Sequence, residues 1–183
     1  MRELTARATL IALVAFAAVS TDLYLSGIPG IVADLGVGHA EGQLTLSLFM
    51  VGFAAGQLLF GPLSDYHGRK PVVAVGLWLY ALASLLCALA PSITTLLGAR
   101  LLQGLAAASG PVIARAIVRD RYRAEDAARM MALLAAAMAV VPLFAPVLGS
   151  WLLYCLDWRA QFAGMLLFGL ATLAGLRARV ESC

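Results

Sequence analysis

The sequence predicts an all-α integral membrane protein built as one bundle of six membrane-spanning helices. The 183-residue chain is 62% hydrophobic and only 13% charged, and its mean hydropathy is +0.92. Soluble domains are nearer half apolar and a quarter charged. The chain also contains six apolar stretches of about the 20 residues that a helix needs to cross a bilayer. These stretches show no two-residue alternation and are about twice the length of a barrel strand, which argues against a membrane β-barrel.

The connections between the apolar stretches are short, so consecutive helices are expected to be antiparallel neighbours in a single domain of residues 1–183. The first stretch continues past Asp22 to Ile31, and this length suits a span better than a signal peptide. The predicted spans cover residues of about 8–31, 42–63, 71–90, 93–118, 130–153 and 160–176.

The basic residues predict how the bundle is oriented. Eleven of the thirteen lie at one end of the predicted spans, Arg100 lies within a span, and Arg159 alone lies at the other end. By the positive-inside rule the basic end faces the cytoplasm, so both termini are expected there. The positive charge therefore reports topology, and nucleic-acid binding is not expected because its basic footprint lies on a soluble face.

Catalytic and metal-binding constellations are not indicated. The three cysteines show no metal-ligand spacing. His39 and His67 both fall in predicted connections, so Ser109 in the fourth span has no base to activate it. We expect no enzymatic activity, no metal and no cofactor.

Asp22 and Arg100 are charged residues well inside predicted spans, where charges are costly and usually mark ion or substrate pathways. Asp22 lies eight residues from the outer end of the first span, and Arg100 lies seven residues from the outer start of the fourth. At 1.5 Å per residue both are about 10–12 Å deep. We expect them to neutralise each other if their helices face a shared space. Proton coupling through Asp22 is the functional interpretation, and a static salt bridge is the alternative.

Three further polar side chains are predicted to line the same cavity. Gln103 follows Arg100 by three residues, so both lie on one helix face. Tyr24 is two residues from Asp22 and lies on a different side of its helix. Gln57 in the second span is the third, with a helix-to-helix hydrogen bond as its alternative role.

Small residues predict close helix packing. Gly52 and Gly56 are four residues apart in the second span, and Gly104 with Ala108 form a similar pair in the fourth. Such pairs let helix backbones approach each other in membranes. The fifth span carries two internal prolines, Pro142 and Pro146, which predict a bend that is either a hinge or a fixed curve.

The connection between the second and third spans has a distinctive sequence, GPLSDYHGRK. It resembles the loop between helices 2 and 3 of the major facilitator superfamily of transporters. Tyr66 departs from the basic residue common at its place. The positions that match the loop signature are Gly61, Asp65, Gly68, Arg69 and Lys70.

Other segments resemble one branch of that superfamily, the drug:proton antiporters, and within it the bicyclomycin/chloramphenicol-resistance (Bcr/CflA) subfamily. The segment from Arg100 to Gly104 resembles the helix 4 motif Arg-x-x-Gln-Gly. Pro142, Pro146 and Gly149 fall in a stretch similar to the helix 5 antiporter motif Gly-Pro-x-x-Gly-Gly. The segments similar to the subfamily are Asp22-Leu-Tyr-Leu, Gly56-Gln57-Leu, Arg115 to Asp120, and Asp157-Trp-Arg.

The resemblance implies a multi-pass protein of the bacterial inner membrane that exports small hydrophobic drugs in exchange for protons. It also implies that residues 61–70 form a cytoplasmic gate. Superfamily members have twelve helices in two halves, and this chain resembles the N-terminal half alone. The expected partners are a small hydrophobic substrate, protons, the lipid bilayer, and either a C-terminal half or a second copy. The alternative is a non-transporting truncated remnant or an accessory six-helix subunit.

Overall fold

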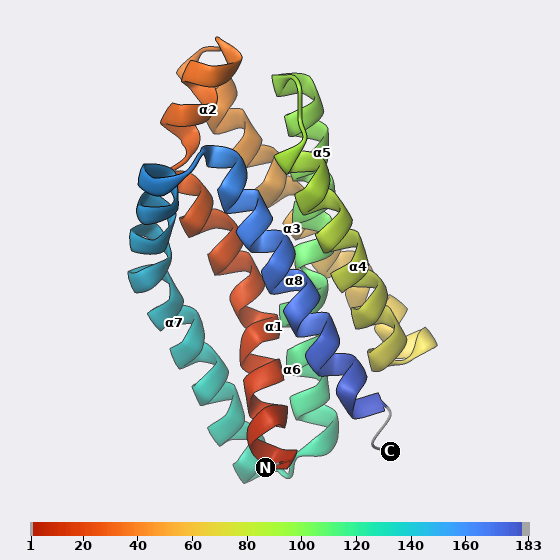
Figure 1. Ribbon diagram of the computed structural model, residues 1–183. Helices are drawn as coiled ribbons and strands as arrows, with labels where there is room; N and C mark the ends of the chain where they lie inside the picture. The colour runs from red at the N-terminus through yellow and green to blue at the C-terminus, as the bar shows by residue number, and fades with distance from the viewer. Residues whose placement is uncertain (1, 181–183) are drawn as a thin grey trace.

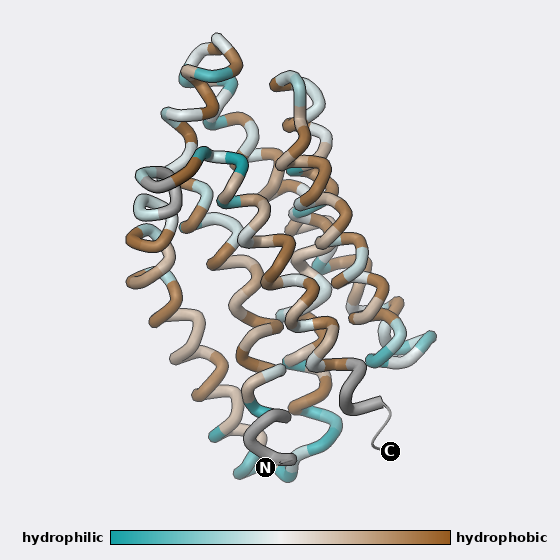
Figure 2. Tube along the Cα trace, in the orientation of Figure 1, coloured by the Kyte–Doolittle hydropathy of each residue, from teal (hydrophilic) through white to brown (hydrophobic). Residues whose placement is uncertain are grey.

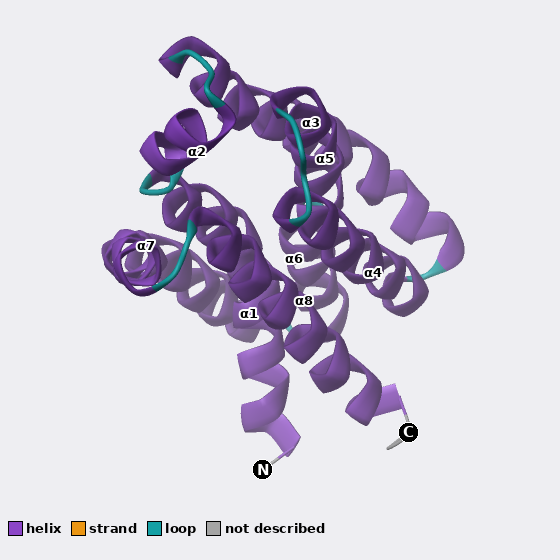
Figure 3. Cartoon of the chain, turned by 45° about the horizontal axis from the view of Figure 1, so that its top comes forward, coloured by secondary structure: helices purple, strands orange, loops and turns teal. Residues whose placement is uncertain are grey.

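A computed structural model describes residues 2–180 as helices and short connections, with no strand in that range. Residues 1 and 181–183 of the predicted domain, Cys183 among them, lie outside the described residues. The all-α class is confirmed, and Figure 3 shows helices joined by short loops. The helices are α1 (Arg2–Leu25), α2 (Ile28–Leu35), α3 (His39–His67), α4 (Arg69–Ala88), α5 (Ile93–Ala107), α6 (Ser109–Arg121), α7 (Ala124–Cys155) and α8 (Trp158–Val180).

Six segments in the described range are long and apolar enough to cross a membrane, which confirms the predicted number. Two of the predicted spans are broken rather than continuous, and proline explains both breaks. A proline has no N–H to donate to the carbonyl four residues earlier, and its ring clashes with that carbonyl. Helix α1 ends at Leu25, four residues before Pro29, and α5 ends at Ala107, four residues before Pro111. The first span therefore continues into α2, and the fourth is α5 followed by α6.

Helix α1 starts and α8 ends at the same end of the bundle, with α2 and the start of α5 at the opposite end (Figure 1). This agrees with an even number of crossings. Figure 2 shows hydrophilic residues gathered at the two ends and hydrophobic residues along the middle of the helices. The end with the termini is the predicted cytoplasmic end, and it is called the inner end below.

Helices α3 and α5 pack backbone against backbone through glycines. A Cβ atom at Gly52 would overlap Leu101 O, and one at Gly104 would overlap Phe49 O. A Cβ at Gly56 would overlap Leu105 O in the same way. The predicted close packing at these small residues is confirmed. It brings Phe49 of α3 next to the helix turn that carries Arg100.

The spans differ greatly in how much of their surface the bundle covers. Within the most hydrophobic window of each span, 67% of the α5–α6 residues are buried but only 11% of the α7 residues. Helix α7 packs on α1 at one edge of the bundle (Figures 1 and 3). Helix α3 is also poorly covered, with 28% of its window buried. One face of the bundle, formed by α3 and α7, is thus left open.

Candidate functional site

Arg100 is fully buried between helices, and no carboxylate in the described part of the chain pairs with it. Its guanidinium carbon lies 4.0 Å from the centre of the Tyr24 ring and 4.4 Å from the centre of the Phe49 ring. Both terminal nitrogens point to Ser20 O at 3.4 Å, and Nη1 also donates to Gln103 Oε1 at 2.7 Å. Aromatic faces and oxygen dipoles together stabilise a cation that would be very costly in a purely apolar interior.

The polar network extends from Arg100 across the bundle. Gln103, predicted to share a face with Arg100, donates from Nε2 to Ser84 Oγ at 2.8 Å. Ser84 Oγ in turn donates to Tyr80 O at 2.8 Å, and Tyr80 OH is 2.6 Å from Ser20 Oγ. These contacts join α1, α4 and α5. Fixed hydrogen-bond networks of this kind give a membrane bundle a single packing arrangement.

Tyr24 connects the network to α3. Its hydroxyl hydrogen-bonds to Thr45 Oγ1 while its ring covers the Arg100 guanidinium. Phe162 of α8 packs on the Tyr24 ring, with ring centres 5.6 Å apart. We call Ser20, Tyr24, Ser84, Arg100 and Gln103 the Arg100 cluster.

Asp22 does not join this cluster, so the expected ion pair between Asp22 and Arg100 is absent from the structure. The carboxylate is partly buried, and it accepts a long hydrogen bond from Thr21 Oγ1 at 3.5 Å. Residues two apart on a helix point about 200° apart. Because Tyr24 faces Arg100, Asp22 must face another direction. Matching depth in the membrane was therefore not enough to bring the two charges together.

Gln57 also lies apart from Arg100. It is exposed on α3 and lines a cavity of about 390 Å³ with residues of α6 and α7. Of the five residues predicted for the cavity, the structure brings Tyr24, Arg100 and Gln103 together and leaves Asp22 and Gln57 at other places.

At the inner end, Arg69 at the start of α4 bonds to residues of α3 and α6. Its Nη1 lies 2.5 Å from Asp65 Oδ1 and 2.6 Å from Ser64 Oγ at the end of α3. Its Nε donates to Asp120 Oδ2 at 2.9 Å at the end of α6. The Arg69 side chain is 20% exposed, so these charge-assisted bonds are partly sheltered from water. Asp65 and Arg69 are both signature residues of the connection, whereas Asp120 lies outside the signature.

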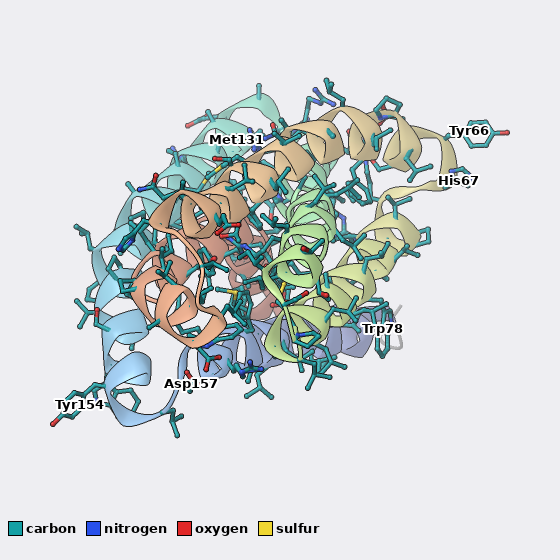
Figure 4. The ribbon with its side chains drawn as sticks, turned by 90° about the horizontal axis from the view of Figure 1, so that it is seen from above. Tyr66, His67, Trp78, Met131, Tyr154 and Asp157 are labelled. Atoms are coloured by element: carbon teal, nitrogen blue, oxygen red, sulfur yellow. The ribbon has the colours of Figure 1, made fainter. Side chains whose placement is uncertain are left out.

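The other signature residues of this connection have separate roles. Gly68 adopts φ +91°, a conformation that side-chain-bearing residues rarely take, and α4 starts directly after it. Gly61 accepts a hydrogen bond at its carbonyl from Ser64 Oγ at 2.9 Å. Lys70 is exposed and, within the described part of the chain, forms no ion pair. It lies about 100° round α4 from Arg69. Tyr66 points away from the bundle (Figure 4).

Helix α7 carries the predicted antiporter motif. Pro142 and Pro146 are exposed and lie inside a helix that continues past both. Gly149 is buried, and a Cβ there would lie 2.5 Å from Leu23 O of α1 and from Ser26 Oγ just after α1. Gly149 O accepts a hydrogen bond from Gln161 Nε2 at 3.0 Å. Gly149 therefore allows the close contact between α7 and the end of α1.

The outer end has a set of polar contacts between α2 and α8 that was not predicted from the sequence and is called the outer clamp below. Asp34 of α2 accepts hydrogen bonds from Trp158 Nε1 at 3.1 Å and from Arg159 Nη2 at 3.2 Å, both on α8. The Asp157 carboxylate accepts from the Trp158 backbone N–H at 2.6 Å at the start of α8. Arg159 is the one basic residue predicted at the outer end. Because an isolated charge there needs an acidic partner, this residue could have indicated the contact with Asp34.

Comparison with protein families gives a match over residues 10–181 to the Major Facilitator Superfamily. The chain belongs to this superfamily. The match covers nearly the whole chain, including the Arg100 cluster, the inner-end contacts of Arg69 and the outer clamp.

Relatives within the superfamily share substantial identity. The MFS-type transporter YdgK of Bacillus subtilis (strain 168) is 40% identical over 162 residues, which are 86% of this chain and 40% of YdgK. The multidrug resistance protein MdtL of Escherichia coli (strain K12 / DH10B) is 38% identical over 152 residues, or 83% of this chain and 39% of MdtL. The chain thus spans about 40% of the length of these relatives.

A solved structure shows the same fold. The human organic anion transporter MFSD10 (TETRAN) superposes with a TM-score of 0.72 over 96% of this chain and 47% of its own, at 21% identity. The six-span bundle is therefore half of a superfamily fold, as predicted.

Proposed function

We propose that the chain is the N-terminal six-helix half of a proton-coupled exporter of small hydrophobic drugs, of the Bcr/CflA kind, in a bacterial inner membrane. The observation that carries the proposal is the 38% identity with the multidrug resistance protein MdtL over 83% of the chain.

The geometry of Asp22 supports a coupling role different from the one expected. A carboxylate that is partly buried in a span, with no ion-pair partner among the described residues, is free to gain and lose a proton. Intramembrane carboxylates commonly form proton pathways. We assign proton coupling to Asp22 and a fixed structural charge to Arg100. The two residues act on different faces of their helices.

The open α3–α7 face supports a second half. Helix α7 has 11% of its span window buried, and exported substrates in this fold pass between two halves that rock against each other. We assign the α3–α7 face to contact with a C-terminal six-helix half. The partner half completes the path for a small hydrophobic substrate.

The test is co-expression of this chain with the C-terminal half of MdtL in a bacterium that lacks its own drug exporters. The pair should lower chloramphenicol accumulation, and a protonophore should abolish the difference. Each half alone, inserted to the same level, should leave accumulation unchanged. If the inserted pair gives no protonophore-sensitive export of chloramphenicol or a panel of hydrophobic drugs, the proposal fails and a non-transporting membrane subunit replaces it.

A further inference from the structure

A groove runs between α4 and α8 along the outside of the bundle. Helices α4 and α8 pack on each other, and α7 lies at the opposite edge (Figures 1 and 3). The groove has a volume of about 550 Å³ and is lined by residues of α4 between Val75 and Leu85 and by two leucines of α8. None of the lining side chains is charged or carries an amide or hydroxyl group. We call this hollow the α4–α8 groove.

Large side chains border the groove, and its floor is small. Ala81 of α4 lines the groove and is buried, and a Cβ added at Gly169 of α8 would lie 3.9 Å from Ala81 Cβ. Positions 78, 82 and 85 share one stripe of α4, because residues three and four apart on a helix face the same way. The bordering side chains are Trp78, Leu82 and Leu85 of α4 and Leu166 and Leu170 of α8. Figure 4 shows Trp78 at the outside of the bundle. The groove therefore results from the packing of the two helices and runs along their axes.

The groove lies at the depth of the lipid tails. Val75 is six residues, and Leu85 sixteen, from the inner end of α4 at Arg69, or about 9 and 24 Å at 1.5 Å per residue. The hydrocarbon core of a bilayer is about 30 Å thick. On the outside of the bundle, this depth is reached by lipid chains and by other membrane-embedded molecules, so the occupant of the groove comes from the membrane.

The width and the lining of the groove favour a hydrocarbon chain over a helix or a drug. Spread over a length of about 15 Å, its volume averages roughly 37 Å² in cross-section. A helix with its side chains is about 10–12 Å in diameter, or about 80–110 Å², so a helix of a second copy is too wide to enter. Drug sites place a few polar groups that fix the orientation of the ligand, and the lining of this groove offers dispersion contacts instead.

We propose that the α4–α8 groove holds one straight acyl chain of a membrane lipid, packed lengthwise against Trp78, Leu82 and Leu170. Lipid tails are as apolar as the protein surface, so a preference for the groove depends on van der Waals contact. A chain in the groove contacts the floor and both borders, whereas a chain on a convex helix surface is contacted on one side. The proposal requires only insertion in a membrane, so its outcome is independent of the proposed drug transport.

The experiment uses the full 183-residue chain in nanodiscs of diphytanoyl phosphatidylcholine, whose methyl branches widen the lipid chains. A phosphatidylcholine brominated near the middle of a straight stearoyl chain is added in rising mole fraction, because bromine quenches tryptophan fluorescence on contact. The Trp151→Phe chain reports on Trp78, since Trp158, the third tryptophan, is buried. The Trp78→Phe chain is the matched control, because it reports on Trp151, which is exposed on α7 outside the groove.

Half-maximal quenching of Trp78 should require at least about threefold less brominated lipid than half-maximal quenching of Trp151, since the groove adds contacts to the straight chain. Leu82→Ala and Leu170→Ala lower the two borders. Combined in the Trp151→Phe background, they should abolish this preference. Leu58→Ala is the control substitution: it removes the same side chain from an exposed position of α3 and should leave the preference unchanged.

Three results would overturn the proposal. The first is that Trp78 and Trp151 are half-quenched at the same mole fraction of brominated lipid. The second is a preference at Trp78 that persists when both Leu82 and Leu170 are replaced by alanine. The third is weaker quenching of Trp78 than of Trp151 at every mole fraction, which would show that a protein surface, such as a second copy of the chain, covers the groove.

Discussion

The Arg100 guanidinium carbon lies 4.0 Å from the centre of the Tyr24 ring, and no acidic side chain of the described residues pairs with it. Tyr24 thus covers the Arg100 guanidinium with its ring and hydrogen-bonds to Thr45 of α3 with its hydroxyl. The tyrosine takes the position that a carboxylate was expected to hold. This arrangement supports the proposal that Arg100 is a fixed structural charge and that Asp22 exchanges protons.

The ring and the hydroxyl of Tyr24 can be tested separately. Tyr24→Phe keeps the ring over Arg100 and removes the bond to Thr45, so it should cost about 1 kcal/mol of unfolding free energy. Tyr24→Leu also removes the cation–π contact, which is worth about 2 kcal/mol more when desolvated. Unfolding of the purified chain in mixed detergent micelles measures both. Equal losses in the two variants would show that the ring does not stabilise Arg100.

Arg100→Met should destabilise the bundle although it removes a costly buried charge. The substitution leaves Gln103 Oε1 without its 2.7 Å donor and Ser20 O without its two long contacts. Unsatisfied buried polar groups cost about 1–3 kcal/mol each. The same unfolding assay on the chain checks this, with Arg129→Met as the control, because Arg129 is exposed and pairs with Glu125 on its own helix. A more stable Arg100→Met chain would contradict the structural role.

From the inner-end contacts we expect Asp65 and Asp120 to affect the rate of drug efflux and the neighbouring Lys70 to have no effect on it. Asp65→Asn and Asp120→Asn each remove one bond to Arg69. A pair of this exposure is worth up to about 1 kcal/mol, equivalent to roughly a fivefold shift between conformations. We expect normal membrane insertion and a several-fold slower drug efflux in the assembled transporter. The Lys70→Gln transporter should export drug at the normal rate. If this substitution slows efflux as much as Asp120→Asn does, the gate assignment is wrong.

Alanine should destabilise the chain at the glycines of the α3–α5 contact and should have little effect at glycines outside it. Gly52→Ala and Gly104→Ala place a Cβ against backbone oxygens of the facing helix, which cannot move aside. Forced overpacking of this kind costs about 1–3 kcal/mol. Gly61→Ala and Gly98→Ala are the controls, because a Cβ at either position meets nothing within 4 Å. Thermal stability of the four purified variants measures the contrast, and similar melting of all four would mean that α3 and α5 do not pack this closely.

The sequence predicts the spans well because each depends on local length and hydropathy. It also predicts that Gly52 and Gly104 allow close packing, and that Gln103 shares a face with Arg100, since both follow from helix spacing. The breaks after Leu25 and Ala107 were missed because proline is tolerated in many membrane helices. Their signal was Pro29 and Pro111, each four residues downstream.

Contacts between distant helices are less predictable from sequence, because they depend on helix rotation. Depth along the membrane normal placed Asp22 and Arg100 at the same level, but the rotation of α1 turned Tyr24 toward Arg100 instead. Asp120 lies 51 residues after Arg69, and several other charges at the inner end were equally plausible partners. Composition alone could not choose among them.

The role of Asp22 has its own test in the assembled transporter. Asp22→Asn keeps the shape of the side chain and removes its ability to exchange a proton, so proton-driven drug efflux should be lost while insertion stays normal. Glu125→Gln is the control, because its carboxylate is exposed and pairs with Arg129 on the same helix. Drug efflux in inverted membrane vesicles energised by a pH gradient provides the measurement. Full proton-driven efflux by Asp22→Asn would remove this residue from the coupling mechanism.

The central claim, that this chain is one half of a proton-coupled drug exporter, is tested most directly in purified proteoliposomes. An imposed pH gradient should drive chloramphenicol accumulation when the chain is reconstituted together with a C-terminal six-helix half. The chain reconstituted alone at the same density should give no accumulation above empty liposomes. Robust pH-driven accumulation by the chain alone would contradict the half-transporter account and would show that a homodimer transports.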